Sequence, residues 1–310
     1  MLLAEEEQPR MLKKRKIVAF VANDAAEYAF KELLLDGVID YVITITPEMA
    51  QRAKVSNYLD VSKYNPENVY YAKRYSLKSS EDLEFFSSNI FDIGLILGWN
   101  RLIPPEIIDT FTHGIIGFHG TPFGLPKGRG RSPAIWSIVL GYDTYFYHAF
   151  KVQPGIDDGP IYVTKAIRIE SYDNIRTFYL KLSYVLKDMA LEAMEKLISG
   201  YQGLPQVGTP IYFRKRDEKD GYIRWELGAW RVYNLVRAIT HPYPGAWTWY
   251  KGEKIRIWWG VPFKEAKGAP GEVIAVFDEG FLVGCGEDSF LVVEYTGKKP
   301  EVGDYLNAKV

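Results

Sequence analysis

The chain has 310 residues, of which 47% are hydrophobic and 25% are charged, and its net charge is −1. These values are typical of a globular protein with one or two domains, and they argue against nucleic acid as an obligatory partner. The single cysteine, Cys285, excludes an internal disulfide and a metal site built from several cysteines. No uninterrupted apolar run reaches the roughly 18 residues of a membrane span, so we expect no membrane partner and a cytoplasmic location.

The N-terminal stretch MLLAEEEQPRMLKKR places three acidic residues before a basic run and has no apolar core of a secretory signal. We predict a flexible N-terminal extension over residues 1–15, loose at least over residues 1–10. The regular pattern of the chain begins at Lys16.

Strands and helices alternate from residue 16 onward. Short apolar runs predict buried strands at residues 16–22, 39–46, 92–100 and 114–120. Helical spacing, an N-cap serine or an opening proline predicts the helices between them, at residues 25–37, 79–89 and 104–111. This alternation predicts an α/β fold with a doubly wound, mostly parallel, Rossmann-like sheet, which binds its ligands at the carboxyl ends of the strands.

Helices and strands continue after residue 131, and the pattern changes only beyond residue 210. Residues 132–141 and 174–200 predict helices, and residues 145–152 and 160–170 predict two more strands. The Gly- and Pro-rich stretch 201–210 is a candidate linker. Short aromatic strands with hairpin signals follow a helical stretch within 223–240. We therefore predict a first domain over residues 16–205 and a C-terminal, OB-like β-barrel domain over residues 206–310.

His119 stands at the carboxyl end of a predicted parallel strand, and the loop Gly155-Ile-Asp-Asp-Gly159 precedes another strand. An imidazole paired with a carboxylate can move protons, so we predict that His119 meets Asp157. A structural histidine and an ordinary turn are the alternatives. The four histidines lack metal-ligand spacing, so no metal site is predicted, and there is no nucleophile elbow, phosphate loop or dinucleotide fingerprint.

Three separated motifs give these residues a family resemblance. His119 is followed by Leu-Pro-Lys-Gly-Arg-Gly-Arg-Ser-Pro at 125–133, then by Asp-Asp-Gly-Pro at 157–160, and the tail contains Arg-Ala-Ile-Thr-His-Pro-Tyr-Pro-Gly-Ala at 237–246. This order resembles the folate-dependent formyltransferase superfamily, which includes methionyl-tRNA and sugar N-formyltransferases. The resemblance implies an enzyme that transfers the formyl group of 10-formyltetrahydrofolate to an amine, with His119 and Asp157 catalytic and residues 16–205 as the catalytic domain.

The chain departs from the family pattern at Gly117, where the family carries an asparagine that stabilises the developing oxyanion. Three readings follow. Asn100 or the hydroxyl of Thr121 replaces that donor, or water and backbone groups suffice with His119 carrying more of the charge. Alternatively, catalysis is lost and the protein is a non-catalytic folate or nucleotide binder.

The resemblance also implies binding residues. For the folate they lie after the third strand and in the acidic loop: Gly98, Trp99, Asn100, Leu102, Ile156, Asp157 and Asp158. For the amine substrate they are Asn23, Asp24, Gly120, Thr121, Arg129 and Arg131. The alternatives are that Trp99 is plain packing, that Asn23-Asp24 is a helix cap, and that the two arginines pin their loop to nearby carboxylates.

The charge of the tail bears on the acceptor. From Pro210 onward there are 15 Lys plus Arg against 14 Asp plus Glu, which is a low excess for a domain that grips an RNA backbone. We therefore favour a small amine, such as a nucleotide-linked amino sugar, over tRNA. A homodimer is compatible with the sequence.

Overall fold

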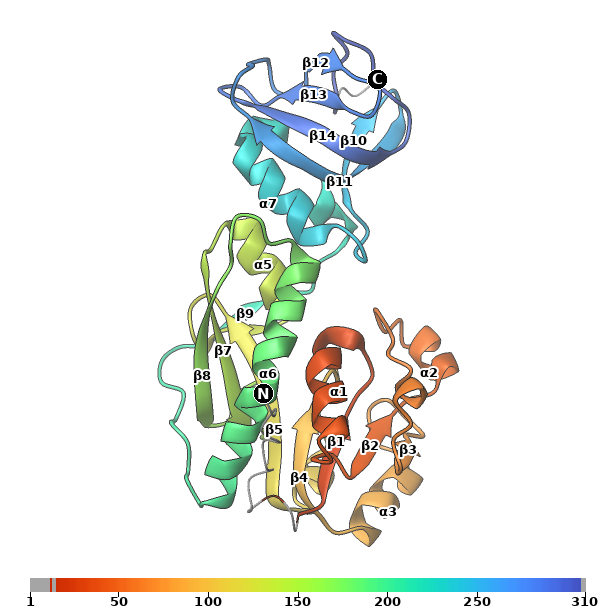
Figure 1. The fold of residues 1–310 in the computed structure, drawn as a ribbon, viewed down its shortest axis with the longest axis vertical. Coiled ribbons are helices and arrows are strands. Elements are labelled where there is room, and N and C mark those ends of the chain that lie inside the picture. Colours follow the sequence, from red (N-terminus) through yellow and green to blue (C-terminus); the bar gives the residue numbers. More distant parts are fainter. Residues whose placement is uncertain (1–11, 13–14, 308–310) are drawn as a thin grey trace, which may run out of the picture. The chain divides into compact units, whose positions relative to one another are not determined.

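The structure, a computed structural model, describes residues 12 and 15–307 (Figure 1). Its main sheet has seven strands in the order β3-β2-β1-β4-β5-β7-β8. The strands are β1 (Ile17–Phe20), β2 (Tyr41–Thr44), β3 (Val69–Tyr71), β4 (Phe91–Ile96), β5 (Phe111–Thr121), β7 (Thr144–Lys151) and β8 (Ile161–Arg168). The pairs from β3 to β5 are parallel, and β5 pairs with β7 in the antiparallel sense. The predicted mostly parallel α/β sheet is confirmed.

Helices cover both faces of this sheet, which explains why the central strand β1 is apolar and buried along its whole length. Ile17 and Ala19 of β1 belong to one core cluster, and Val18 and Phe20 to the other. The helices are α1 (Glu27–Leu35), α2 (Pro47–Arg52), α3 (Ser80–Ser88), α4 (Pro105–Ile108), α5 (Pro133–Leu140), α6 (Ile175–Ile198) and α7 (Ala229–Ile239). Side chains of α1 and α6 contribute to the first cluster, and those of α2, α3 and α4 to the second.

A second sheet is entirely antiparallel, with the order β10-β11-β14-β13-β12. Its strands are β10 (Ala246–Tyr250), β11 (Glu253–Phe263), β12 (Val273–Val276), β13 (Phe281–Gly284) and β14 (Ser289–Thr296). Helix α7 packs on β11 and β14. Within residues 15–307 no pairing joins β12 back to β10, so the predicted small barrel takes the form of a half-barrel.

The described chain divides into two compact units. The first comprises the described residues up to Gly130 together with 146–167 and 179–212, and the second comprises 131–145, 168–178 and the chain from Phe213. The domain limits at 15/16 and 205/206 remain predictions. Leu12 is buried in the first core cluster, and the rest of the predicted loose N-terminus lies outside the described residues.

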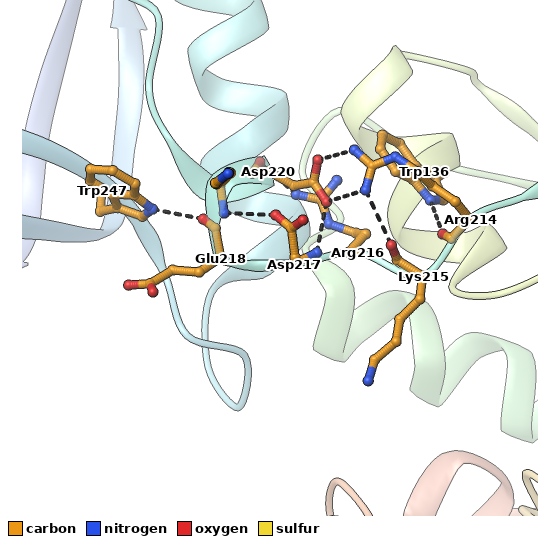
Figure 2. A network of polar contacts seen from close by, with 9 residues as sticks. Trp136, Arg214, Lys215, Arg216, Asp217, Glu218, Asp220 and Trp247 are labelled. Carbon is orange, nitrogen blue, oxygen red and sulfur yellow. Dashed lines mark hydrogen bonds and ion pairs between the residues drawn. The ribbon is translucent and has the colours of Figure 1, made fainter.

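The segment after the predicted linker is held by polar contacts within the second unit (Figure 2). The indole N–H of Trp136, on α5, donates to the carbonyl of Arg214 at 3.1 Å. The Arg214 guanidinium forms an ion pair with Asp220. The indole N–H of Trp247, on β10, donates to the carbonyl of Glu218 at 2.9 Å. Residues 213–221 are therefore fixed against both α5 and the second sheet.

Two helices or strands of the main sheet region, α2 and β3, were not predicted from the sequence, and both are short. Two further strands were also missed: β6 (Lys127–Gly130) and β9 (Ile211–Phe213), which form a two-stranded sheet of their own. Half of β6 is glycine, which has low strand propensity, and its partner is about 80 residues away in the chain. The local sequence therefore does not indicate that these two segments pair as strands.

Candidate active site

Strand β5 extends past its parallel neighbour and carries the predicted catalytic residue. The pairing with β4 ends at Ile116, whereas the pairing with β7 continues to Thr121. Residues 117–121 therefore have a strand on one side only, at the carboxyl end of the parallel strands. This is the edge where open α/β sheets bind ligands.

His119 lies in this overhang and is 8% exposed. Its Nε2 lies 2.9 Å from the carbonyl oxygen of Gly128, and its Nδ1 lies 3.3 Å from Oδ2 of Asp157. A carbonyl only accepts hydrogen bonds, so Nε2 carries a proton. The Nδ1–Oδ2 contact is then favourable only when a further proton lies between these two atoms, because a bare imidazole nitrogen and a carboxylate would repel each other.

The acidic loop brings Asp157 to this position through an unusual backbone. Asp157 has φ +49, in the left-handed region that few residues other than glycine adopt. A Cβ at Gly159 would lie 1.7 Å from the carbonyl oxygen of Lys151, so only glycine fits there. Oδ2 of Asp157 also accepts from the backbone N–H of Gly130 at 3.4 Å, a weak bond. The strained backbone conformation at Asp157 thus sets the direction of this carboxylate.

The loop after His119 is anchored by a second histidine that the sequence analysis did not single out. His148 lies directly opposite His119 on β7. Its Nε2 accepts from the backbone N–H of Leu125 at 3.2 Å, so Nδ1 carries the proton and donates to Oγ1 of Thr164 at 2.9 Å. Burial, and secondarily the charge of His119, lowers the pKa of His148 to about 4, which keeps it neutral. The position of His148 beside the site follows from the register of β5 and β7, which the sequence does not show.

Thr121 takes a structural position in the same loop. Its hydroxyl donates to the carbonyl of Lys127 at 2.7 Å and accepts from the backbone N–H of Phe123 at 3.1 Å. Because the hydroxyl proton is already engaged, Thr121 is poorly placed to replace the missing asparagine as a donor. Gly120, its neighbour, is buried.

The space beside Gly117, where a side chain would stand, is already occupied. A Cβ built there would lie 2.8 Å from Cζ of Phe150 and 3.1 Å from Cγ2 of Val152. Phe150 is the direct cross-strand partner of Gly117. The aromatic ring therefore occupies the space that a side chain at residue 117 would need.

The turn after β4 contacts the turn after β1. The carbonyl of Gly98 accepts from the backbone N–H groups of Ala22 and Asn23 at 3.1 and 3.2 Å. Asn23 is buried and caps the following helical turn through Oδ1, as the alternative reading of this residue predicted, while Asp24 is exposed. Asn100 and Leu102 are exposed, and Trp99 is buried. Gly98, the first of the predicted folate residues, thus lies beside Asn23, just after the carboxyl ends of β1 and β4.

The two predicted substrate arginines have different surroundings. Arg129 is 9% exposed, and its Nε and NH2 groups both donate to Oε1 of Gln206, at 3.2 and 2.6 Å. Arg131 is exposed, and its backbone N–H donates to the carbonyl of Phe213 at 3.0 Å. Their roles in substrate binding remain predictions.

Two features are absent from residues 12 and 15–307. No three His, Cys, Asp or Glu side chains lie together there as ligands of a metal ion. In the same residues, no helix combines the length and the apolar character needed to cross a membrane.

Comparison with known proteins agrees with this geometry. Residues 19–194 match the family model described as "Formyl transferase", and residues 215–309 match "Formyl transferase, C-terminal domain". The methionyl-tRNA formyltransferase of Thermodesulfovibrio yellowstonii is 31% identical over 211 residues, covering 67% of this chain and 67% of that protein.

Solved structures share the fold at lower identity. The sugar 3N-formyl transferase WlaRD, crystallised in the presence of dTDP and 5-N-formyl-THF, is 17% identical with a TM-score of 0.65, covering 92% of this chain and 98% of its own. HypX from Aquifex aeolicus, in complex with tetrahydrofolic acid, is 19% identical with a TM-score of 0.64, covering 92% of this chain and 44% of its own.

Proposed function

Because this chain belongs to the formyltransferase family, we propose that it transfers the formyl group of 10-formyltetrahydrofolate to an amine, with His119 and Asp157 handling the proton. The observation that carries this proposal is the 3.3 Å contact between Nδ1 of His119 and Oδ2 of Asp157 at the carboxyl edge of the sheet. The two residues are 38 positions apart in the chain, and their contact places an acid and a base side by side.

The folate supplies the formyl group. As the amine attacks the formyl carbon, negative charge develops on the formyl oxygen and the amine nitrogen must lose a proton. In the proposed mechanism, the positive charge of protonated His119 stabilises that oxygen, while the Asp157 carboxylate accepts the amine proton directly or through water. The pair then returns a proton to the leaving nitrogen. Because His119 is almost fully buried, its charge acts with little screening by water.

The residues proposed to hold the folate fit a ligand that both donates and accepts hydrogen bonds. Nε1 of Trp99 and Oδ1 of Asp158 are buried without a hydrogen-bond partner among the described residues. Such atoms are costly to bury unless something satisfies them. One is a donor and the other an acceptor, and each lies in one of the two proposed folate segments, 98–102 and 156–158.

A small amine, such as a nucleotide-linked amino sugar, is the acceptor we propose. The nearly balanced charge of the chain from Pro210 onward, 15 basic against 14 acidic residues, supports it, because an RNA-binding domain normally carries a clear basic excess. Methionyl-tRNA is the second candidate, since the relative from Thermodesulfovibrio yellowstonii bears that name.

An acceptor screen tests the proposal. The protein is incubated with 10-formyltetrahydrofolate and either dTDP-linked amino sugars or initiator methionyl-tRNA, and release of tetrahydrofolate is followed. Turnover with the amino sugars supports the proposal. Turnover with the tRNA and not with the amino sugars would mean that the protein catalyses formyl transfer with methionyl-tRNA as its acceptor. Folate binding without turnover on any amine would mean that the site binds but does not catalyse.

A further inference from the structure

We propose that Gln206 is the positioning residue that holds the Asp157 loop against His119. This inference rests on the proposed function of the His119–Asp157 pair. Gln206 lies between the two segments that match the family models, 19–194 and 215–309, so neither match includes it. It follows the main sheet in the chain by some forty residues, in the stretch that the sequence marks only as a linker.

The side-chain amide of Gln206 joins the two loops that form the site. Its Nε2 donates to the carbonyl oxygens of Asp157 and Gly159 at 2.8 and 2.9 Å. Its Oε1 accepts from the Nε and NH2 groups of Arg129. The neighbours of Arg129 contact the catalytic pair, Gly128 through His119 and Gly130 through Asp157. One amide therefore ties the acidic loop to the loop that carries the carbonyl partner of His119.

Only one orientation of the amide satisfies these contacts. Arg129 offers donors and cannot accept, whereas the two loop carbonyls accept and cannot donate. The oxygen must therefore face Arg129 and the nitrogen must face the loop. All four hydrogen bonds of this amide are made at once, which a glutamate or a leucine at this position could not reproduce.

The loop needs such a tie because its backbone is strained. Asp157 adopts φ +49. Besides its contact with His119, the Asp157 carboxylate accepts a hydrogen bond from the backbone N–H of Gly130, and this bond is long at 3.4 Å. Without Gln206, two loop carbonyls would lose their donor at the residue whose carboxylate has to stay within reach of Nδ1. A displacement of about 1 Å at a reacting group can cost about 100-fold in rate.

The test compares three variants of the full chain. Gln206→Leu removes all four hydrogen bonds, and Gln206→Glu keeps an acceptor for Arg129 but cannot donate to the loop. Gln202→Leu is the matched control, because Gln202 lies four residues earlier in the same stretch and its side chain donates to the carbonyl of Gly200, away from the site. The measurements are kcat and KM for formyl transfer, and hydrogen exchange of residues 155–160 and of the Gly130 amide.

We expect Gln206→Leu and Gln206→Glu to lower kcat about 10- to 100-fold and to speed hydrogen exchange in the acidic loop at least about 10-fold, with Gln202→Leu unchanged in both. If Gln206→Leu does not fold, Gln206→Glu gives the same readouts. Unchanged loop exchange in the Gln206 variants overturns the inference, and so does an equal effect of Gln202→Leu. If the parent protein transfers no formyl group, the proposed function fails, while the exchange measurement still decides the role of Gln206.

Discussion

Phe150 of β7 lies directly opposite Gly117 of β5, and Cζ of its ring is 2.8 Å from the point where a Cβ of residue 117 would stand. An aromatic residue opposite a glycine is a stabilising arrangement in antiparallel strands, because the ring covers the exposed glycine backbone. Gly117 is therefore part of a packed pair. The site has no vacancy into which the family's asparagine could simply be restored.

Replacing Gly117 by Asn should accordingly destabilise the protein. The new side chain collides with the Phe150 ring, and overpacking of this kind costs about 1–3 kcal/mol in the free energy of unfolding. Phe150→Ala should relieve the collision, so that the double variant is more stable than the sum of the two single effects. Urea unfolding of the four proteins measures this coupling. A Gly117→Asn variant as stable as the parent would mean that Phe150 does not fill this space.

His148 makes the stability of the protein sensitive to acid. Burial lowers its pKa to about 4 in the folded state, against about 6.5 when exposed. Above about pH 6.5 the group is neutral in both states and its full contribution is present. As the pH falls toward about 4, only the unfolded chain takes up the proton, so the free energy of unfolding drops by about 3 kcal/mol.

His148→Asn should remove this dependence. We expect its unfolding free energy, followed from pH 7 to pH 4, to fall less steeply than that of the parent. Equal slopes for His148→Asn and the parent would show that His148 takes up a proton in the folded protein as easily as in the unfolded chain.

Arg129 and Arg131 should respond differently to the same substitution. Arg129→Met leaves Oε1 of Gln206 without its two donors, which should cost about 1–3 kcal/mol of stability and reduce kcat. Arg131→Met removes an exposed side chain, so we expect a stability change within about 0.5 kcal/mol and, if this guanidinium binds an acceptor phosphate, a higher KM. Thermal unfolding and steady-state kinetics measure both. A raised acceptor KM with unchanged stability in Arg129→Met would instead favour direct phosphate binding.

The sequence predicted those features that leave a local pattern. The buried runs at Ile17–Phe20 and Phe91–Ile96 read as strands because both faces of the sheet are covered, and Ser79 marked the start of α3 through its capping bond. The order of the motifs around His119 and Asp157 was enough to expect that these residues meet. The structure brings them within 3.3 Å.

Features that depend on pairing between distant segments were not predictable. His148 is opposite His119 only because of the β5–β7 register, and nothing in the stretch YFYHAFKV reveals that register. Phe150 lies over Gly117 for the same reason. Gln206 stands in a Gly- and Pro-rich stretch whose composition indicates a linker, and its contacts are with residues 47 to 77 positions earlier.

The role of the His119–Asp157 pair is tested most directly by the single-turnover rate constant of formyl transfer in His119→Asn, Asp157→Asn and the double variant. We predict that each single variant loses about 10²- to 10⁴-fold and that the double variant is little slower than the slower single variant, because the two side chains act as one unit. A His119→Asn protein that transfers the formyl group at the parent rate would contradict this account.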